Sequence, residues 1–423
     1  MFQFIISLAG RAAAIVMALY MASSFIACSF TPPEISGGHE VDLSNGIQPY
    51  EVNAILQSGP ITRELDESTT LKFETSDELL VRHSRICVKA KRAYSDGSNG
   101  GEYGIRLQTR VPMTTLPYDT ATAFLNGWSL EYTQSDHQVL ALGVGVFNIT
   151  WENKVLTFEA GGLIMDQNGD DSLKLCVYPT VVAWNSNLIE ALTWHEEFED
   201  ELTFTHQTGH DGETTALRNL SGSYQGDAQD SLFIPKAVIP RGFAFLWEGS
   251  EDHNLLQLAF DLGYHLYLQH RPGAIAWNSR TILKDNRTRA NYYGAELVSV
   301  LSGPGITEIP QGASFTRPFP MQPRNKGNCP GDFSFEVTEQ SWFSQIEGYD
   351  YIVPVLKGFD IAGYCDDNHV TKIGAGINAF NFDPSRNLST YTIESSFFDK
   401  DNNPGADQSF FNVSLLGFKV KQP

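Results

Sequence analysis

One pattern occurs three times in this chain, with its first Asp recurring after 116 and then 115 residues. Each copy has a glycine followed by an aromatic residue, and then an Asp with a histidine next to it or two positions later. The copies are Gly127-Trp128 with Asp136-His137, Gly242-Phe243 with Asp252-His253, and Gly358-Phe359 with Asp367-Asn368-His369. A repeat on this scale predicts that one module is used three times.

A run of alternating apolar residues follows the Asp in each copy. The three runs are Leu140, Leu142, Val144 and Val146; Leu256, Leu258, Phe260 and Leu262; and Thr371, Ile373, Ala375 and Ile377. A period of two with one apolar face predicts a half-buried strand. Each copy then has an aromatic residue (Phe158, Trp277 or Tyr391) eight positions before a second Asp, at 166, 285 or 399, and closes with another β-rich run.

Composition supports the same fold class. The chain has 36 Gly, 20 Pro and 12% aromatic residues, and no long helical periodicity follows residue 30. We therefore expect an all-β fold with three tandem antiparallel β-sandwich repeat units, at 61–184, 185–303 and 304–423, each with about seven to nine strands in two facing sheets. Pro235, Pro240 and Pro354 predict that the strands around them are edge strands or strand starts.

The first 60 residues differ from the rest. Arg11 precedes an apolar run from 12 to 27, which predicts a signal peptide over 1–27, because the run is short for a membrane span. The segment Phe25-Ile26-Ala27-Cys28 resembles a bacterial lipobox, although Phe replaces the usual Leu, so we expect lipidation at Cys28. In the alternative, this is an ordinary cleaved signal. Residues 28–60 carry Pro and Gly and predict a tether or linker.

Four cysteines remain after Cys28, an even number that suits disulfide bonds in an oxidising compartment. Cys87 and Cys176 fall in the first expected unit, and Cys329 and Cys365 fall in the third. Pairing within each unit is the simplest of the three connectivities.

Two acidic loops follow the second Asp of a copy and are candidate calcium sites. Their alternating oxygen ligands are Asp166, Asn168 and Asp170 in the first unit, and Asp399, Asp401, Asn403 and Asp407 in the third. Calcium prefers several such oxygens. However, the second unit has Asp285-Asn286-Arg287, whose arginine would repel a cation, and Asx-rich hairpin turns explain all three loops without metal. Both interpretations stay open.

Charge and motifs limit the function classes. The net charge of -21 argues against binding nucleic acid, because phosphates would be repelled. The sequence has no Gly-x-Ser-x-Gly elbow, phosphate-binding glycine loop or Cys-x-x-Cys pair. We therefore expect no catalytic activity. The Asp-His clusters of the three copies fit either a ligand-contacting edge or capped turns.

The order of elements within each unit resembles the H-type lectin sandwich. The resemblance is carried by Ile352-Val353-Pro354-Val355-Leu356-Lys357-Gly358-Phe359 and the strand from Val370, and by the equivalent parts of the other units. The Trp-Asp-Thr step that such lectins carry near their end is absent. The resemblance implies a binding module, and no sugar-binding residue carries over.

The sequence thus predicts a bacterial lipoprotein of the cell envelope, at the outer membrane or surface, or else a secreted protein. We expect it to bind glycans or envelope proteins through repeated modules, where several weak sites gain avidity. Its membrane contact would be the lipid anchor. The alternatives are a structural or assembly subunit of the envelope and a secreted hydrolase.

Overall fold

The structure is a computed structural model in which the chain divides into two compact units, Met1–Asn45 and Gly46–Pro423. All residues described below belong to the second unit. The described residues are 67–90, 101–112, 117–132, 139–166, 173–197, 205–208, 214–227, 229–247, 255–267, 273–285, 292–314, 333–340, 348–362, 370–385, 388–399 and 408–422.

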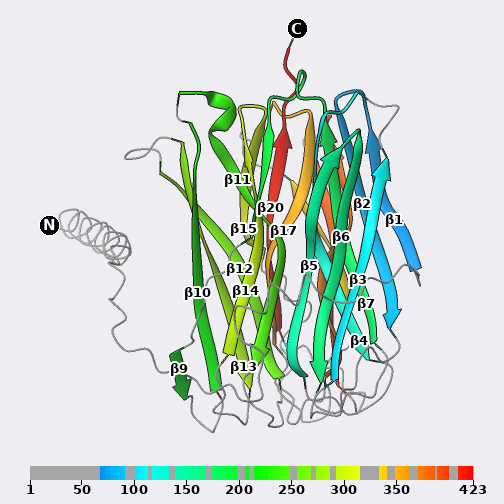
Figure 1. Ribbon diagram of the computed structural model, residues 1–423, viewed down its shortest axis with the longest axis vertical. Coiled ribbons are helices and arrows are strands. Elements are labelled where there is room, and N and C mark those ends of the chain that lie inside the picture. The colour runs from blue at the N-terminus through cyan, green and yellow to red at the C-terminus, as the bar shows by residue number, and fades with distance from the viewer. Residues whose placement is uncertain are drawn as a thin grey trace, which may run out of the picture. The chain divides into compact units, whose positions relative to one another are not determined.

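The described residues form twenty β-strands and one short 3-10 turn, Ser231–Phe233 (Figure 1). The strands are β1 (Glu67–Thr75), β2 (Leu79–Ala90), β3 (Gly101–Pro112), β4 (Thr120–Tyr132), β5 (Val139–Glu152), β6 (Val155–Asp166), β7 (Leu173–Trp184), β8 (Leu192–Glu197), β9 (Thr205–Thr208), β10 (Thr214–Gln225), β11 (Pro235–Trp247), β12 (Leu255–Tyr267), β13 (Ala274–Asp285), β14 (Tyr292–Ser302), β15 (Ile306–Ser314), β16 (Phe333–Gln340), β17 (Tyr351–Ala362), β18 (Val370–Asp383), β19 (Leu388–Asp399) and β20 (Gln408–Phe418). The expected all-β, antiparallel fold is confirmed.

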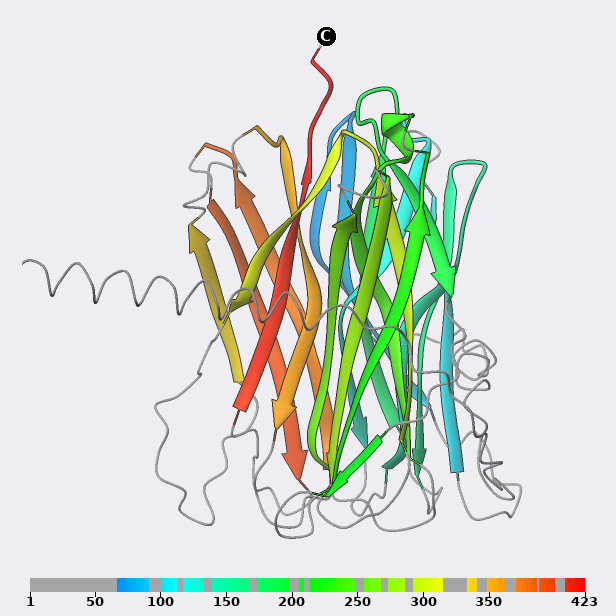
Figure 2. The same cartoon turned by 90° about the vertical axis from the view of Figure 1, so that its left-hand side faces the viewer.

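Three sheets hold these strands. Their orders are β1-β2-β7-β4-β18-β19-β16, β15-β20-β17-β12-β13-β10-β9 and β3-β6-β5-β11-β14-β8. Every sheet therefore joins strands from two of the expected units. In Figure 2, for example, the orange strand β17 near the C-terminus lies beside the green strand β12 from the middle of the chain.

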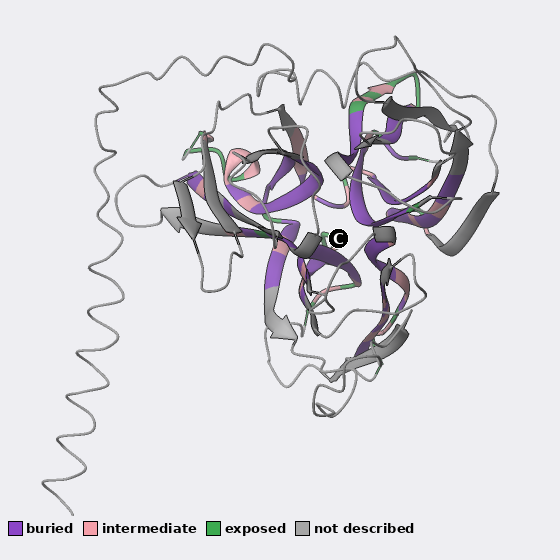
Figure 3. Ribbon diagram, turned by 90° about the horizontal axis from the view of Figure 1, so that it is seen from below, coloured by how far each residue is buried: buried purple, intermediate pink, exposed green. Residues whose placement is uncertain are grey.

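The alternating runs form β5, β12 and β18, as predicted. Their apolar positions are buried wherever the side chain is described: Leu142, Val144 and Val146; Leu258, Phe260 and Leu262; and Ile373, Ala375 and Ile377. The aromatic residues that precede the second Asp, Phe158, Trp277 and Tyr391, are buried as well. Figure 3 shows the buried segments on the inner sides of the sheets, and one apolar cluster contains residues from all three sheets.

Each sheet has one pairing that joins two expected units, which we call a seam. The first seam pairs β4 with β18, the second pairs β11 with β5, and the third pairs β17 with β12. In each seam, the strand that carries the Gly-aromatic step pairs with the alternating strand of another copy. The opposed residues are Gly127 and Gly376, Gly242 and Gly145, and Gly358 and Asp261.

The aromatic residue next to each seam glycine points into one common cluster. The ring centroids lie 5.4 Å apart for Trp128 and Phe243, 5.5 Å for Trp128 and Phe359, and 5.1 Å for Phe243 and Phe359. Aromatic pairs at these separations stabilise beyond their buried area. Residues more than 100 positions apart in the chain therefore share one central contact.

The residue before each seam glycine is polar and buried, and it bonds to the backbone of another strand. Asn126 donates to the Pro354 carbonyl and accepts from the Leu356 amide, at 2.9 Å each. Arg241 donates to the Val298 carbonyl at 3.0 Å. Lys357 donates to the Val238 carbonyl and lies 3.0 Å from the Glu308 carboxylate. These partners satisfy groups that burial would otherwise penalise.

The edge-strand prediction from the prolines is wrong for β11 and β17, which lie inside their sheets. Only the expectation of a strand start holds, at Pro235. The reason is local: each seam begins at the glycine, so Pro240 and Pro354 precede the seam ladder. A proline that lacks an amide proton is tolerated there.

Candidate functional site

The outer face of the first seam carries a hollow of about 240 Å³. Its lining comes from five strands, β2, β7, β4, β18 and β19, that were expected to belong to the first and third units. The lining residues are Arg85, Trp128, Ser129, Tyr178, Lys372, Gly374, Ala375, Glu394, Ser395 and Ser396.

Alternation along the strands places this hollow opposite the main core. Trp128, Val177 and Ile373 belong to that core, and their neighbours Ser129, Tyr178 and Lys372 or Gly374 must face the other side of the sheet. The outer face has its own small buried cluster of Cys87, Cys176 and Tyr178. The site is therefore built on a rigid sheet that is packed from behind.

Glycines allow the two strands of the seam to approach closely under the Tyr178 ring. A Cβ added to Gly376 would lie 2.8 Å from both the Gly127 Cα and the Tyr178 ring. A Cβ on Gly374 would lie 2.6 Å from the Trp128 carbonyl oxygen and the Ser129 Cβ. Glycine inside a strand often marks such a close approach.

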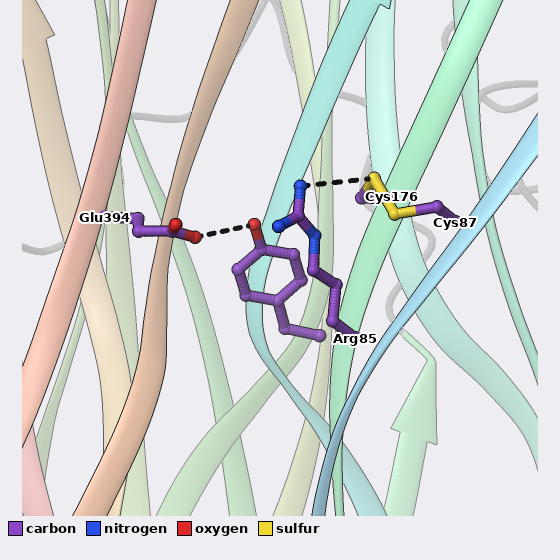
Figure 4. Close-up of a disulfide and its surroundings, with 5 residues drawn as sticks. Arg85, Cys87, Cys176 and Glu394 are labelled. Atoms are coloured by element: carbon purple, nitrogen blue, oxygen red, sulfur yellow. Dashed lines mark hydrogen bonds between the residues drawn. A yellow bond between two sulfur atoms is a disulfide. The ribbon is translucent and has the colours of Figure 1, made fainter. Parts of the chain in front are cut away.

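Three polar side chains from different strands meet at the hollow. The Tyr178 hydroxyl donates to Glu394 Oε2 at 2.9 Å. The Arg85 guanidinium carbon lies 5.5 Å from the centre of the Tyr178 ring, which is within the range of a cation–π contact. Arg85 Nη2 also lies 3.9 Å from Cys176 Sγ, and Figure 4 shows Arg85 between Glu394 and the disulfide.

Burial and the nearby Glu394 carboxylate both raise the pKa of Tyr178, and burial is the larger cause. Arg85 opposes this shift. The phenol therefore stays protonated at neutral pH and keeps its hydrogen bond to Glu394. This holds the carboxylate in place at one wall of the hollow.

The predicted bond between Cys87 and Cys176 is confirmed. The two cysteines are directly opposed in the β2–β7 ladder, so the bridge joins neighbouring strands beneath Arg85. Cys329 and Cys365 lie outside the described residues, and their pairing stays a prediction.

The other predicted site residues lie at the limits of what the structure describes. Asp166 and Asp399 are the last residues of β6 and β19, and their side chains are not described. Cys28, the clusters from Asp136, Asp252 and Asp367, and the rest of the acidic loops fall outside the described residues: Asn168, Asp170, Asp401, Asn403 and Asp407. Calcium binding and lipidation therefore stay predictions. Among the described residues, no three His, Cys, Asp or Glu side chains gather as a metal site.

Sequence reasoning missed Arg85, Tyr178, Lys372 and Glu394. They have no common motif and come from strands far apart in the chain, so only the seam brings them together. The available signal was the pair of glycines at 374 and 376 within an alternating strand, which indicated a close backbone approach.

A scan against models of protein families, a search of curated proteins and a search of solved structures each returned no match. In the described segments, no helix has the length and apolar character needed to cross a membrane.

Proposed function

We propose that this protein is an exported, lipid-anchored, non-catalytic binding protein that recognises glycan or protein ligands through a β-rich body of three tandem sandwich repeats. The hollow at the first seam is the observation that carries the binding role. It presents cations, a carboxylate and several hydroxyl groups on a stiff sheet. A concave surface with a few fixed polar groups is the usual form of a small-ligand site.

The repeat part of the proposal is supported by the equivalence of the three seams. In each seam the same step of the motif supplies a glycine at the strand crossing, an aromatic residue to the central cluster and a buried polar residue before the glycine. One ancestral unit that was copied twice explains this agreement. The ends of β7 and β14 lie at or next to the predicted unit boundaries.

Stiffness favours recognition, because a preformed site loses little conformational entropy when it binds. The floor of the hollow is held by the seam ladder, the Cys87–Cys176 bridge and the buried Tyr178. Three related units on one tether would let weak sites act together on a surface that carries many copies of the ligand.

A glycan array probed with the full-length protein in detergent tests the binding role. We expect selective binding to a small set of sugars, and weaker binding after Arg85→Ala and Tyr178→Phe, which change the hollow. The matched control is Tyr349→Phe, at a tyrosine that does not line the hollow. Absence of binding to sugars and to envelope proteins alike would contradict the proposal.

Export and anchoring are tested separately in a bacterial host. We expect the chain to incorporate a radiolabelled fatty acid and to fractionate with membranes. Cys28→Ala should abolish the label. A labelled Cys28→Ala variant, or an unlabelled wild-type chain, would contradict lipidation at Cys28.

A further inference from the structure

We infer that the hollow at the first seam binds the carboxylate of a single acidic sugar, or of another hydroxylated acid of that size. This inference rests on the proposed binding function and names the chemical class of its ligand. It is carried by the charge, size and hydroxyl content of the hollow.

The charge of the lining favours an anion. Arg85 and Lys372 contribute two cations against the single carboxylate of Glu394. Charge-assisted hydrogen bonds to a carboxylate are stronger than neutral ones, and an arginine can make two of them at once. An acidic ligand would therefore gain more from this lining than a neutral one.

The protein holds Arg85 in position but does not use all of its hydrogen-bond donors. Among the described residues, its buried Nε has no hydrogen-bond partner, and its Nη2 lies 3.9 Å from the disulfide sulfur of Cys176. Sulfur is a weak acceptor. The guanidinium lies against the Tyr178 ring, so it is held at the wall of the hollow while donor capacity remains for an incoming oxyanion.

The size and the remaining polar groups select a small hydroxylated molecule. Sites for drug-sized ligands occupy roughly 300–1,000 Å³, whereas this hollow measures about 240 Å³. One sugar ring fits that scale. Ser129, Ser395 and Ser396 line the hollow and can bond sugar hydroxyls, and Glu394 can accept from a hydroxyl while it keeps its bond from Tyr178.

The corresponding positions in the other seams have different chemistry. In the second seam, Gly242 pairs with the buried Leu297, and Gly145 pairs with Gly161. In the third seam, Asn412 donates to Asp261 at 2.6 Å. Of the three seams, the first is the one in which a tyrosine–glutamate pair lies beside an arginine.

The net charge of -21 does not prevent this binding. Charges farther away than the Debye length, about 8 Å at physiological ionic strength, are largely screened. Arg85 and Lys372 would act on the ligand at contact distance. We therefore expect the affinity to be set by the lining and the association rate to be reduced by the acidic surface.

The experiment is a calorimetric titration of the full-length protein with galacturonate, with galactose as the neutral sugar and acetate as the bare carboxylate. We expect galacturonate to bind more tightly than both. Lys372→Gln and Arg85→Gln should each weaken galacturonate binding about tenfold, the loss of one charge-assisted contact. Glu394→Gln should strengthen it, because a negative charge is removed from the hollow.

The matched control is Lys419→Gln, which removes the same charge from an exposed lysine that does not line the hollow. It should leave the affinity unchanged. Since Glu394→Gln predicts a gain, a variant that merely unfolds cannot produce the expected pattern.

Equal affinity for galactose and galacturonate, or no response to Lys372→Gln and Glu394→Gln, would overturn the assignment of an anion. Equal affinity for acetate would overturn the assignment of a sugar. In these cases, binding on the glycan array would still uphold the proposed function. Failure of the array as well would mark the failure of the binding role itself.

Discussion

The first and third seams have the same inner face and different outer faces. On the inner side, Trp128 and Phe359 are both buried in the central aromatic cluster. On the outer side, the first seam pairs Tyr178 with Glu394, whereas the third pairs Asn412 with Asp261. The inner face determines how strands from different expected units join. The outer face is free of that requirement, so it can differ between seams and provide specificity.

The second seam extends this comparison. The paired residues Gly145 and Gly161 occupy the positions that are equivalent to the pair Gly376 and Glu394 of the first seam. A Cβ on Gly145 would come no closer than 3.3 Å to its neighbours, against 2.8 Å at Gly376. The space at Gly145 is therefore more open than that at Gly376, although a Cβ on the opposed Gly242 would lie 2.6 Å from the Val144 carbonyl oxygen. Four sets of substitutions test this difference between the shared inner face and the differing outer faces, in order of decreasing effect.

Trp128→Ala should have the largest effect, because it removes the biggest member of the central cluster. Truncation of a buried tryptophan typically destabilises by about 3–5 kcal/mol. Urea unfolding followed by circular dichroism gives the free energy of unfolding. Trp151→Ala is the control, since Trp151 is only partly buried at the margin of the core. Equal losses in both variants would refute a special role for the cluster.

Removal of the bridge by Cys87→Ala with Cys176→Ala should come next. The bridge closes a loop with a sequence separation of 89, and loss of a native disulfide typically costs about 2–4 kcal/mol. Thermal unfolding of the double variant and of the wild type, both under oxidising conditions, measures this loss of stability. A double variant as stable as the wild type would show that the outer face of the first seam is not held by the bridge.

Gly376→Ala and Gly145→Ala compare the first and second seams directly. The new methyl group at 376 would clash with the Gly127 backbone, so we expect a loss of about 1–3 kcal/mol from overpacking. At 145 the nearest atom belongs to the Phe147 ring at 3.3 Å, and the ring can shift. Chemical denaturation of both variants checks the order. A larger loss at 145 would contradict it.

Tyr178→Phe should have the smallest effect at neutral pH, about 1 kcal/mol, the net value of one hydrogen bond. Because the folded pKa of Tyr178 is raised above 10, its contribution is fully present below the unfolded pKa. It is lost as the pH rises toward the folded pKa. Stability measured at increasing alkaline pH should therefore fall less steeply in Tyr178→Phe than in the wild type.

Tyr118→Phe serves as a comparison outside the seam. Burial, followed by the charges of Asp77 and other neighbours, raises the pKa of Tyr118 to about 12. Its contribution should also disappear between pH 10 and about 12, independently of Glu394. If Tyr178→Phe leaves the alkaline decline unchanged while Tyr118→Phe reduces it, the raised pKa of Tyr178 is wrong.

The strands were predictable from the sequence because burial of one face imposes a period of two on the residues. This succeeded at Leu142, Val144 and Val146, and the shared spacing placed the equivalent strands in the other copies. The position of β11 and β17 inside their sheets was not predictable. Pro240 and Pro354 suggest an edge, and only the late start of each seam ladder reconciles them with an interior strand.

The candidate site was not predictable for a related reason. Arg85, Tyr178 and Glu394 meet because β4 pairs with β18, and nothing in the local sequence of either strand specifies its partner in another unit. The disulfide was predictable from the sequence, because four cysteines can pair in only a few ways. The polar cluster above it depends on contacts between strands more than 200 residues apart.

The most direct test of the proposed tripled architecture is a set of double-mutant cycles among Trp128, Phe243 and Phe359, each replaced by Leu. If the three repeats meet at one cluster, every pair should show a coupling energy of about 0.5–1.5 kcal/mol in unfolding free energy. Additive effects in all three pairs, as for residues that do not touch, would contradict it.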